Sequence, residues 1–245
     1  MADSIIYKLN NLHHCILSNF AEKDCRTFPD FKTEVMKRFG FENKFGWNIM
    51  LNAIYLIDDT ELAKISFQKF GLQGPARYDD PGEKYLRLYG ILNAIYQQYQ
   101  ALSNLLELYK IDNKKEIIEE LKGSRILMLR NKIASHSANY ANKKSEQQNK
   151  FDVFEVYRYA LSYEKIIILR NQEESDKYDL TNDLKDYDAL FIDNLYKIVE
   201  KAIKKAFNNS SKFKEKLESI SDEINGRIVI KDNDGKKIII QNDII

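Results

Sequence analysis

An arginine and a histidine separated by five residues are the pair in this chain best suited to chemistry. They begin and end one short segment, whose residues are Arg130, Asn131, Lys132, Ile133, Ala134, Ser135 and His136. RNA cleavage through the ribose 2′-hydroxyl needs a proton acceptor, a proton donor for the leaving oxygen and positive charge beside the phosphate. A histidine near its ordinary pKa fits either proton-transfer role, and the planar arginine fork fits the third. The segment therefore predicts phosphodiester cleavage that requires no metal ion.

The segment is expected on a helix from Arg125 to Tyr140, where Arg130 takes an unusual place. At about 100° per residue, Ile126 and Ala134 lie within about 40° of Arg130, so the cation falls inside the apolar stripe. A guanidinium buried without a partner is costly. Arg130 is therefore expected either to meet an acidic side chain within the fold or to face a cleft.

His136 is expected on the same helix, about 120° from Arg130, with Ile133 between them. The two side chains would flank one strip of the helix surface, against which a phosphate could lie. A second copy of the chain, related by a two-fold axis, would supply a matching pair and make this convergence easier. The spacing thus favours a homodimer with a composite active site.

The segment resembles the Arg-x(4–6)-His signature of the HEPN superfamily, which includes toxin and abortive-infection ribonucleases and the RNase domains of type VI CRISPR effectors. The resemblance covers residues 85–140. It implies a mainly α, HEPN-like helical bundle and a metal-independent endoribonuclease that cleaves RNA, with tRNA as a candidate target, to 2′,3′-cyclic phosphate ends. Arg130 would stabilise the phosphorane, His136 would transfer protons and Asn131 would position one of them. The residues expected to bind RNA or support the site are Lys132, Ser135 and Tyr140.

The resemblance also implies the partners and the setting. It suggests a toxin–antitoxin or anti-phage defence system, with RNA as substrate, a second copy of the chain, an antitoxin or sensor protein, and no cofactor. The spacer of five residues lies within the family range, in which four is commoner. Ala138 occupies the position at which related toxins often carry a tyrosine. The resemblance therefore concerns the cleavage chemistry and leaves the regulatory scheme open.

Two alternatives compete with the catalytic hypothesis. In the first, the chain is a non-catalytic helical HEPN-like binding or interaction module, in which Arg130 is structural and bonded to a nearby carboxylate, and His136 is a surface residue near a helix end. In the second, the chain is a subunit held inactive by an antitoxin or a sensor partner. Cleavage of RNA by the purified protein would separate these hypotheses.

Other candidate residues favour structural roles. His13 and His14 are adjacent on a predicted helix, so their side chains point about 100° apart and are poorly placed to share one ion. Cys15 and Cys25 show no zinc-binding pattern and are expected to be reduced and buried. The tyrosines of residues 85–109 have helical spacing, which favours core positions over base stacking. The lysines near the C-terminus alternate with glutamates, as on a solvated face, and are Lys201, Lys204, Lys205, Lys212, Lys214 and Lys216.

Composition limits the class of protein. The 245 residues are 44% hydrophobic, which is enough for a sizeable core, and the formal net charge is only +1. Because no global basic field is present, any RNA contact must come from a local patch. The first residues show no uninterrupted apolar signal region, and no stretch is apolar enough to span a membrane. We therefore expect a cytoplasmic protein without a membrane partner.

Hydrophobic periodicity predicts mostly helices. We expect residues 1–225 to form a helical domain with a β-hairpin inserted at about 151–171, and residues 226–245 to form a C-terminal β-hairpin around an Asp-Gly turn. The glycine- and proline-containing segment 71–82 is the clearest break and could be a mobile loop over a site, and 141–150 is expected to be a solvated loop. The predicted helices are 4–22, 30–39, 46–58, 60–70, 83–110, 113–122, 125–140, 183–207 and 212–224.

Overall fold

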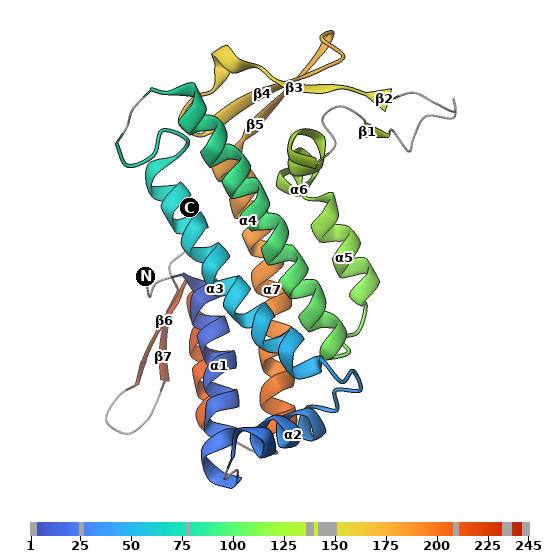
Figure 1. Cartoon of the computed structure of the whole chain (residues 1–245). Helices are drawn as coiled ribbons and strands as arrows, with labels where there is room; N and C mark the ends of the chain where they lie inside the picture. Colours follow the sequence, from blue (N-terminus) through green and yellow to red (C-terminus); the bar gives the residue numbers. More distant parts are fainter. Residues whose placement is uncertain are drawn as a thin grey trace. The chain divides into compact units, whose positions relative to one another are not determined.

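The computed structural model is mainly helical (Figure 1) and describes residues 4–24, 27–76, 79–135, 140–141, 151–207, 211–231 and 237–241. Its helices are α1 (Ile5–Asp24), α2 (Phe28–Phe39), α3 (Gly46–Phe70), α4 (Pro81–Leu108), α5 (Lys114–Gly123), α6 (Arg125–Arg130), the π-helix η1 (Asn131–Ser135), the 3₁₀ turn η2 (Arg158–Ala160), α7 (Leu180–Ala206) and α8 (Ser211–Ile224). Its strands are β1 (Tyr140–Ala141), β2 (Phe151–Asp152), β3 (Phe154–Val156), β4 (Lys165–Arg170), β5 (Glu174–Asp179), β6 (Arg227–Lys231) and β7 (Lys237–Gln241).

The chain divides into two compact units. Unit 1 comprises residues 1–54, 104–112 and 192–245, and unit 2 comprises residues 55–103 and 113–191. The helices α3, α4 and α7 contribute residues to both units. Each unit is discontinuous in sequence, so its core is assembled from segments that are far apart along the chain.

Unit 1 is built from α1, α2, α8, the adjoining parts of the long helices and the β6–β7 hairpin. Local signals define α2, since Thr27 accepts a hydrogen bond from the Asp30 amide at its start and Gly40, at φ 66°, ends it. In the core, His13 hydrogen-bonds the Tyr109 hydroxyl at 2.7 Å, and both side chains are fully buried. The hairpin pairs Val229 with Ile239 in antiparallel register, which confirms the two predicted C-terminal strands, whereas the predicted Asp-Gly turn between them lies outside the described residues.

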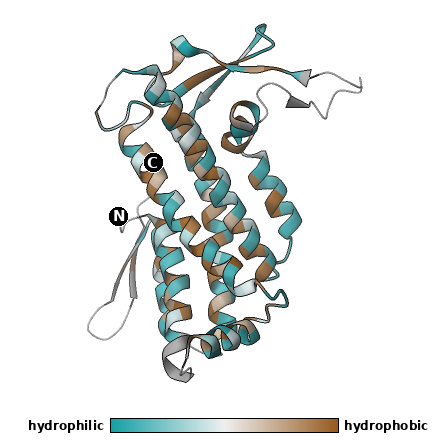
Figure 2. Ribbon diagram, viewed as in Figure 1, coloured by the Kyte–Doolittle hydropathy of each residue, from teal (hydrophilic) through white to brown (hydrophobic). Residues whose placement is uncertain are grey.

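Unit 2 contains the motif and a small antiparallel sheet of order β3-β4-β5. In Figure 1 this sheet lies beyond the N-terminal end of α4. Figure 2 shows that apolar and polar residues succeed one another along α4. The buried residues that form the core of unit 2 include Ile57, Phe67, Leu88, Leu92, Ile95, Leu121, Ile126, Leu129, Ile166, Ile168, Leu184, Tyr187 and Phe191.

The break after α3 is tied to the rest of unit 2 at its described residues. Gly71 has a φ of 57°, and a Cβ atom there would lie 2.5 Å from the carbonyl oxygen of Tyr163, so only glycine fits without a shift. The Leu72 amide donates to that same oxygen at 2.8 Å, and the Arg87 side chain donates to the Gly71 carbonyl at 2.8 Å. Gly71 and Leu72 are therefore held by backbone and side-chain hydrogen bonds.

Three expectations about the elements need correction. The helix predicted from Arg125 to Tyr140 is α-helical only to Arg130, continues as the π-helix η1, and gives way to strand β1 at Tyr140. The inserted hairpin is a three-stranded sheet, because β5 pairs with β4 along its whole length. The helical runs predicted at 46–58 and 60–70 form one continuous helix.

Two of these errors arise because strand pairing depends on residues that are distant in the sequence. β-Branched and aromatic residues predict β3 and β4, but β5 has the sequence Glu-Ser-Asp-Lys-Tyr-Asp and exposes most of its side chains. Only its backbone pairing and Tyr178 mark it as a strand. Likewise, Tyr140 pairs with Asp152 across a long intervening segment. Helical periodicity does not predict such a pairing, because it depends only on residues close together in the sequence.

Candidate functional site

Arg130 lies at the junction between α6 and η1 and is only partly buried. Its guanidinium carbon lies 3.7 Å from the centre of the Tyr96 ring, on α4, in a cation–π contact. Its Nη1 donates a hydrogen bond of 3.1 Å to the Oδ1 of the neighbouring Asn131. Within the described part of the chain, no carboxylate forms an ion pair with Arg130. The arginine on the apolar stripe is thus held by an aromatic ring.

The backbone changes its hydrogen-bonding pattern at this point. Residues Asn131–Ser135 form a π-helix, in which each turn closes from residue i to residue i+5. Such turns are rare and are often found at functional sites. Ile133, in the middle of η1, is buried, whereas Ala134 is exposed. The π turn therefore places one side of the predicted motif against the core and the other toward solvent.

Lys132 connects η1 to strand β5. Its Nζ lies 3.0 Å from the carboxylate of Asp176 and donates to the Tyr178 hydroxyl at 2.9 Å. Burial acts to lower the pKa of Lys132, but the hydrogen bonds to Tyr178 and Asp176 outweigh it and raise the pKa. The same lysine lowers the pKa of Asp176 through their hydrogen bond. Lys132 was predicted to bind RNA or support the site, and its contacts in the structure tie the motif to the sheet.

A second cation holds the start of the motif helix. The guanidinium carbon of Arg125 lies 4.7 Å from the Tyr178 ring centre, its Nε lies 3.0 Å from Asp183, and its Nη2 donates to the Lys177 carbonyl. Burial raises the pKa of Asp183 even though Arg125 opposes this effect. Arg125 and Lys132 therefore connect α6 and η1 to strand β5.

Arg130 lines a pocket of 320 Å³. Four other residues line it, Tyr89 and Asn93 from α4 and Ile133 and Ala134 from η1. Of the two arrangements expected for Arg130, a cleft or an acidic partner, the structure shows the first, since Arg130 lines this pocket. Arginine has five N–H donors, and among the described residues only Asn131 accepts a hydrogen bond from it, so donors remain for a ligand.

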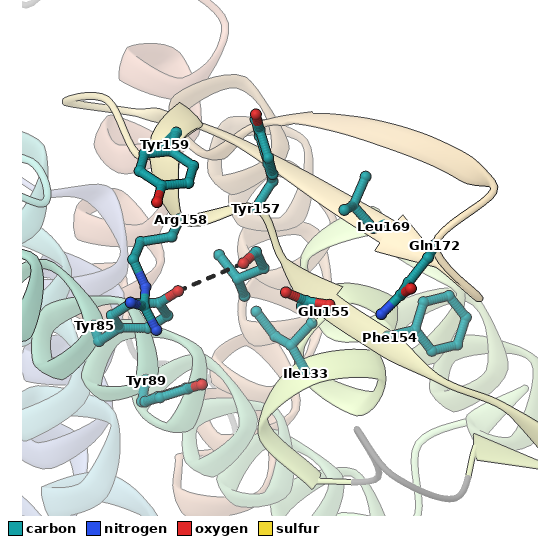
Figure 3. A pocket seen from close by; sticks show the side chains of 11 residues that line it. Tyr85, Tyr89, Ile133, Phe154, Glu155, Tyr157, Arg158, Tyr159, Leu169 and Gln172 are labelled. Carbon is teal, nitrogen blue, oxygen red and sulfur yellow. Dashed lines mark hydrogen bonds between the residues drawn. The ribbon is translucent and has the colours of Figure 1, made fainter.

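A larger pocket of 670 Å³ adjoins the first, because Tyr89 and Ile133 line both. Figure 3 shows it between the N-terminal part of α4, η1 and the outer strand β3, and we call it the aromatic pocket. Its polar lining includes Glu155 and Arg158. The aromatic residues that line it are Tyr85, Tyr89, Phe154, Tyr157 and Tyr159.

Part of the predicted site lies outside the described residues. His136, the expected proton-transfer residue, follows directly after η1 and is one of these, as is Ala138. The backbones of Ser135 and Tyr140 are placed in η1 and β1, but their side chains are not described. The structure thus brings together Arg130, Asn131 and a pocket, and the role of His136 stays a prediction.

The other candidates from the sequence lie elsewhere. Burial, together with the charge of His14, lowers the pKa of His13 to about 3, so His13 is a neutral core residue. Cys15 is a free, partly buried cysteine, and Cys25 lies outside the described residues. The C-terminal lysines Lys204, Lys212, Lys214 and Lys216 are exposed.

A buried polar cluster in unit 2 was not predicted. Lys64 is fully buried and contacts Glu61 at 2.8 Å, Gln98 at 3.4 Å and the carboxylate of Asp188. Burial raises the pKa of Asp188 to about 6, although Lys64 opposes this effect. The cluster joins α3, α4 and α7 inside the unit, so a structural role accounts for it.

The sequence also missed the aromatic residues around Arg130. Tyr85, Tyr89 and Tyr96 were assigned to the core by their helical spacing, yet Tyr89 is 42% exposed and lines both pockets. Tyr157 and Tyr159 were assigned only to a hairpin. The clustering of tyrosines in two segments was the available signal, but their convergence depends on tertiary packing.

No described group of three or more histidine, cysteine, aspartate or glutamate side chains could hold a metal ion. None of the described helices combines the length and apolar character needed to cross a membrane. Comparison with protein-family models, curated proteins and solved structures gives no match to the chain.

Proposed function

We propose that the chain is a metal-independent endoribonuclease of the HEPN type, acting on RNA, with tRNA as the candidate target, in a toxin–antitoxin or anti-phage defence setting. The ribose 2′-oxygen attacks the phosphorus, the bond to the 5′-oxygen breaks, and the products are a 2′,3′-cyclic phosphate and a 5′-hydroxyl. In this proposal His136 transfers protons and Arg130 stabilises the charge on the phosphorane.

One observation carries the proposal. Arg130 lines a pocket while its flat face rests on Tyr96, and the described residues offer it no neutralising carboxylate. A cation held in this way keeps its charge and part of its hydrogen-bonding fork for an anionic ligand. The π turn that follows is a second supporting feature, since it is an unusual backbone conformation at the predicted motif.

The test is cleavage of total tRNA by the purified protein in EDTA. We expect cleavage with cyclic phosphate ends, and His136→Ala is expected to lower its rate by about 100-fold or more. Arg130→Ala should cause a loss of about 100- to 1,000-fold, the size expected for removal of a charge-stabilising group. The matched controls are His14→Ala and Arg227→Ala, which change the same residue types at exposed positions and should cleave like the unchanged protein.

A non-catalytic module is the second candidate, because the contacts of Arg130 with Tyr96 and Asn131 would also suit a structural arginine. It predicts no cleavage by any variant and a lower melting temperature for Arg130→Ala. Cleavage that persists in both motif variants would contradict the site assignment.

A further inference from the structure

The aromatic pocket exposes rings that a folded chain would ordinarily bury. Tyr89 is 42% exposed, Tyr157 is 41% exposed and Tyr159 is 87% exposed, and all three line the same hollow. Tyr85 and Tyr89 form one pair on α4, with ring centres 6.0 Å apart, and Tyr157 and Tyr159 form a second pair with centres 5.8 Å apart. Two separate elements thus present tyrosine faces or edges to one space.

The ring of Tyr85 is held in place by the sheet. Its hydroxyl lies 3.5 Å from the carbonyl oxygen of Val156, the contact drawn as a dashed line in Figure 3. Tyr89 lies one helical turn further along α4, toward Arg130. Tyr85, on the α4 side of the pocket, is therefore in contact with the sheet before any ligand binds, which favours binding by reducing the ordering that a ligand must impose.

The charged groups of the pocket distinguish between possible occupants. Figure 3 shows the Arg158 side chain reaching from the end of β3 toward Tyr85, and the Glu155 carboxylate nearer the middle of the pocket. A phosphate inside the pocket would be repelled by Glu155. A neutral planar group with amino donors could instead lie between the rings and offer hydrogen bonds to that carboxylate. Arg158 would then be available to a phosphate on the same ligand.

The size and position of the pocket suit a nucleobase of a chain that also reaches Arg130. Its volume of 670 Å³ falls within the range of about 300–1,000 Å³ that is usual for ligand sites. Because Tyr89 and Ile133 line both pockets, a nucleotide in the aromatic pocket lies next to the pocket of Arg130. Proteins hold single-stranded RNA by stacking its bases on exposed aromatic rings with basic side chains alongside.

We propose that the aromatic pocket binds an unpaired base of single-stranded RNA, stacked on Tyr89 and enclosed by Tyr159, with Arg158 contacting the adjoining phosphate. This inference rests on the proposed function for the identity of the ligand as RNA. It adds that the substrate presents unpaired nucleotides beside the cleaved bond, because a base within a duplex cannot enter the pocket.

The test measures binding separately from cleavage. The probe is a short, fluorescein-labelled 2′-O-methyl oligoribonucleotide of mixed sequence, which cannot be cleaved because its 2′-oxygen is blocked. Tyr89→Ala and Tyr159→Ala are each expected to weaken binding about tenfold, within the range found for the loss of one base–aromatic stack. Tyr89→Phe and Tyr159→Phe keep the ring and should bind like the unchanged protein. Tyr55→Ala is the matched control, since Tyr55 is 54% exposed but lines neither pocket.

The outcomes separate this proposal from the proposed function. If Tyr89→Ala and Tyr159→Ala weaken binding of the blocked oligonucleotide but the unchanged protein does not cleave tRNA, the proposed pocket is supported and the proposed ribonuclease activity is contradicted. Cleavage of tRNA by a protein whose alanine variants bind the probe normally would overturn the pocket alone. Competition by duplex RNA as effective as that by the single strand would also overturn it.

Discussion

At the scale of single residues, the position of Arg130 depends on an aromatic neighbour. A guanidinium stacked on a ring gives up few of its hydrogen bonds, because the N–H groups lie in its plane and the ring contacts its face. Tyr96 therefore lets Arg130 sit at the edge of the core with its donors directed sideways. The Tyr96 hydroxyl is itself an acceptor for the Gln100 side chain at 2.7 Å, which helps to fix the ring.

Substitution of Tyr96 tests this positioning role. Tyr96→Leu removes the ring, and we expect a fall of about tenfold in the rate of RNA cleavage, within the energy range of a cation–π contact. Tyr96→Phe retains the ring and should keep the rate. A purely structural role would instead change the melting temperature in step with activity, so both are to be measured on the two variants. Equal rates for the leucine and phenylalanine variants would contradict the prediction.

His13 gives a prediction for the dependence of stability on pH. Its pKa of about 3 in the folded chain lies below the value of about 6.5 expected in the unfolded chain, because burial and the charge of His14 disfavour the protonated form. Above the unfolded pKa, His13 is neutral in both states, so its ionisation does not lower the free energy of unfolding. As the pH falls below that value, His13 binds a proton in the unfolded chain but not in the folded chain. The free energy of unfolding therefore decreases until the pH reaches the folded pKa.

Between pH 7 and pH 5 this loss should amount to about 2 kcal/mol. Asp188 acts in the opposite direction, since its raised pKa of about 6 lets the folded chain gain a proton over the same range. Comparison with His13→Gln isolates the histidine, because the carboxyl is present in both proteins. Urea unfolding at the two pH values should show a smaller decrease in the free energy of unfolding for the variant. The same decrease in both proteins would be inconsistent with a buried, neutral His13.

At the scale of elements, the short π-helix depends on contacts with the sheet. Five residues form too short a helix to be stable by itself, and Lys132 supplies a fixed link to Asp176 and Tyr178 on β5. Because Lys132 is anchored in this way, a change at this position acts on the geometry of the motif as well as on its charge.

Paired variants separate the structural and RNA-binding roles of Lys132. Lys132→Met and Asp176→Asn are both expected to destabilise the protein by about 1 kcal/mol, since each breaks the same partly exposed ion pair. They should also speed amide hydrogen exchange over residues 131–135. Lys122→Met, which disrupts the exposed pair with Glu119, serves as the control and should change neither quantity. An effect of Lys132→Met on RNA binding alone, without any effect of Asp176→Asn, would favour the sequence-based role.

The sequence predicts the helices better than it predicts the site. Periodic apolar residues correctly identify α1, α4, α7 and α8, because each helix buries a long face. The unusual placement of Arg130 also leads correctly to a cleft. Tyr96 and Tyr159 could not be assigned in this way, since their neighbours depend on which elements meet in the folded chain. The π turn is equally invisible to periodicity, because it changes the backbone over only five residues.

At the scale of the whole molecule, the predicted composite site requires two copies of the chain. Each copy contributes one Arg130 and one His136, so dissociation would separate the pairs across the two-fold axis. Neither pocket described above depends on a second copy, since unit 2 supplies all of their lining residues. Binding of RNA and its cleavage are therefore expected to depend differently on protein concentration.

Dilution tests the requirement for a dimer. We expect the cleavage rate per chain to fall as the protein dissociates, at the concentration at which sedimentation velocity detects monomers. Binding of the blocked oligonucleotide per chain should change less over this range. A protein that is monomeric by sedimentation and cleaves at an undiminished rate would rule out the composite site.

The π-helix η1 bears on how length changes in this segment would be tolerated. A π turn closes from residue i to i+5 where an α turn closes from i to i+4, so it accommodates one additional residue without breaking the helix. The spacer between Arg130 and His136 is one residue longer than the commoner spacing of the family it resembles. Deletion of the exposed Ala134 would allow α6 to continue as an ordinary α-helix and would shorten the spacer by one. The motif is thus expected to tolerate the loss of a single residue in η1, because the π turn can revert there to an α turn.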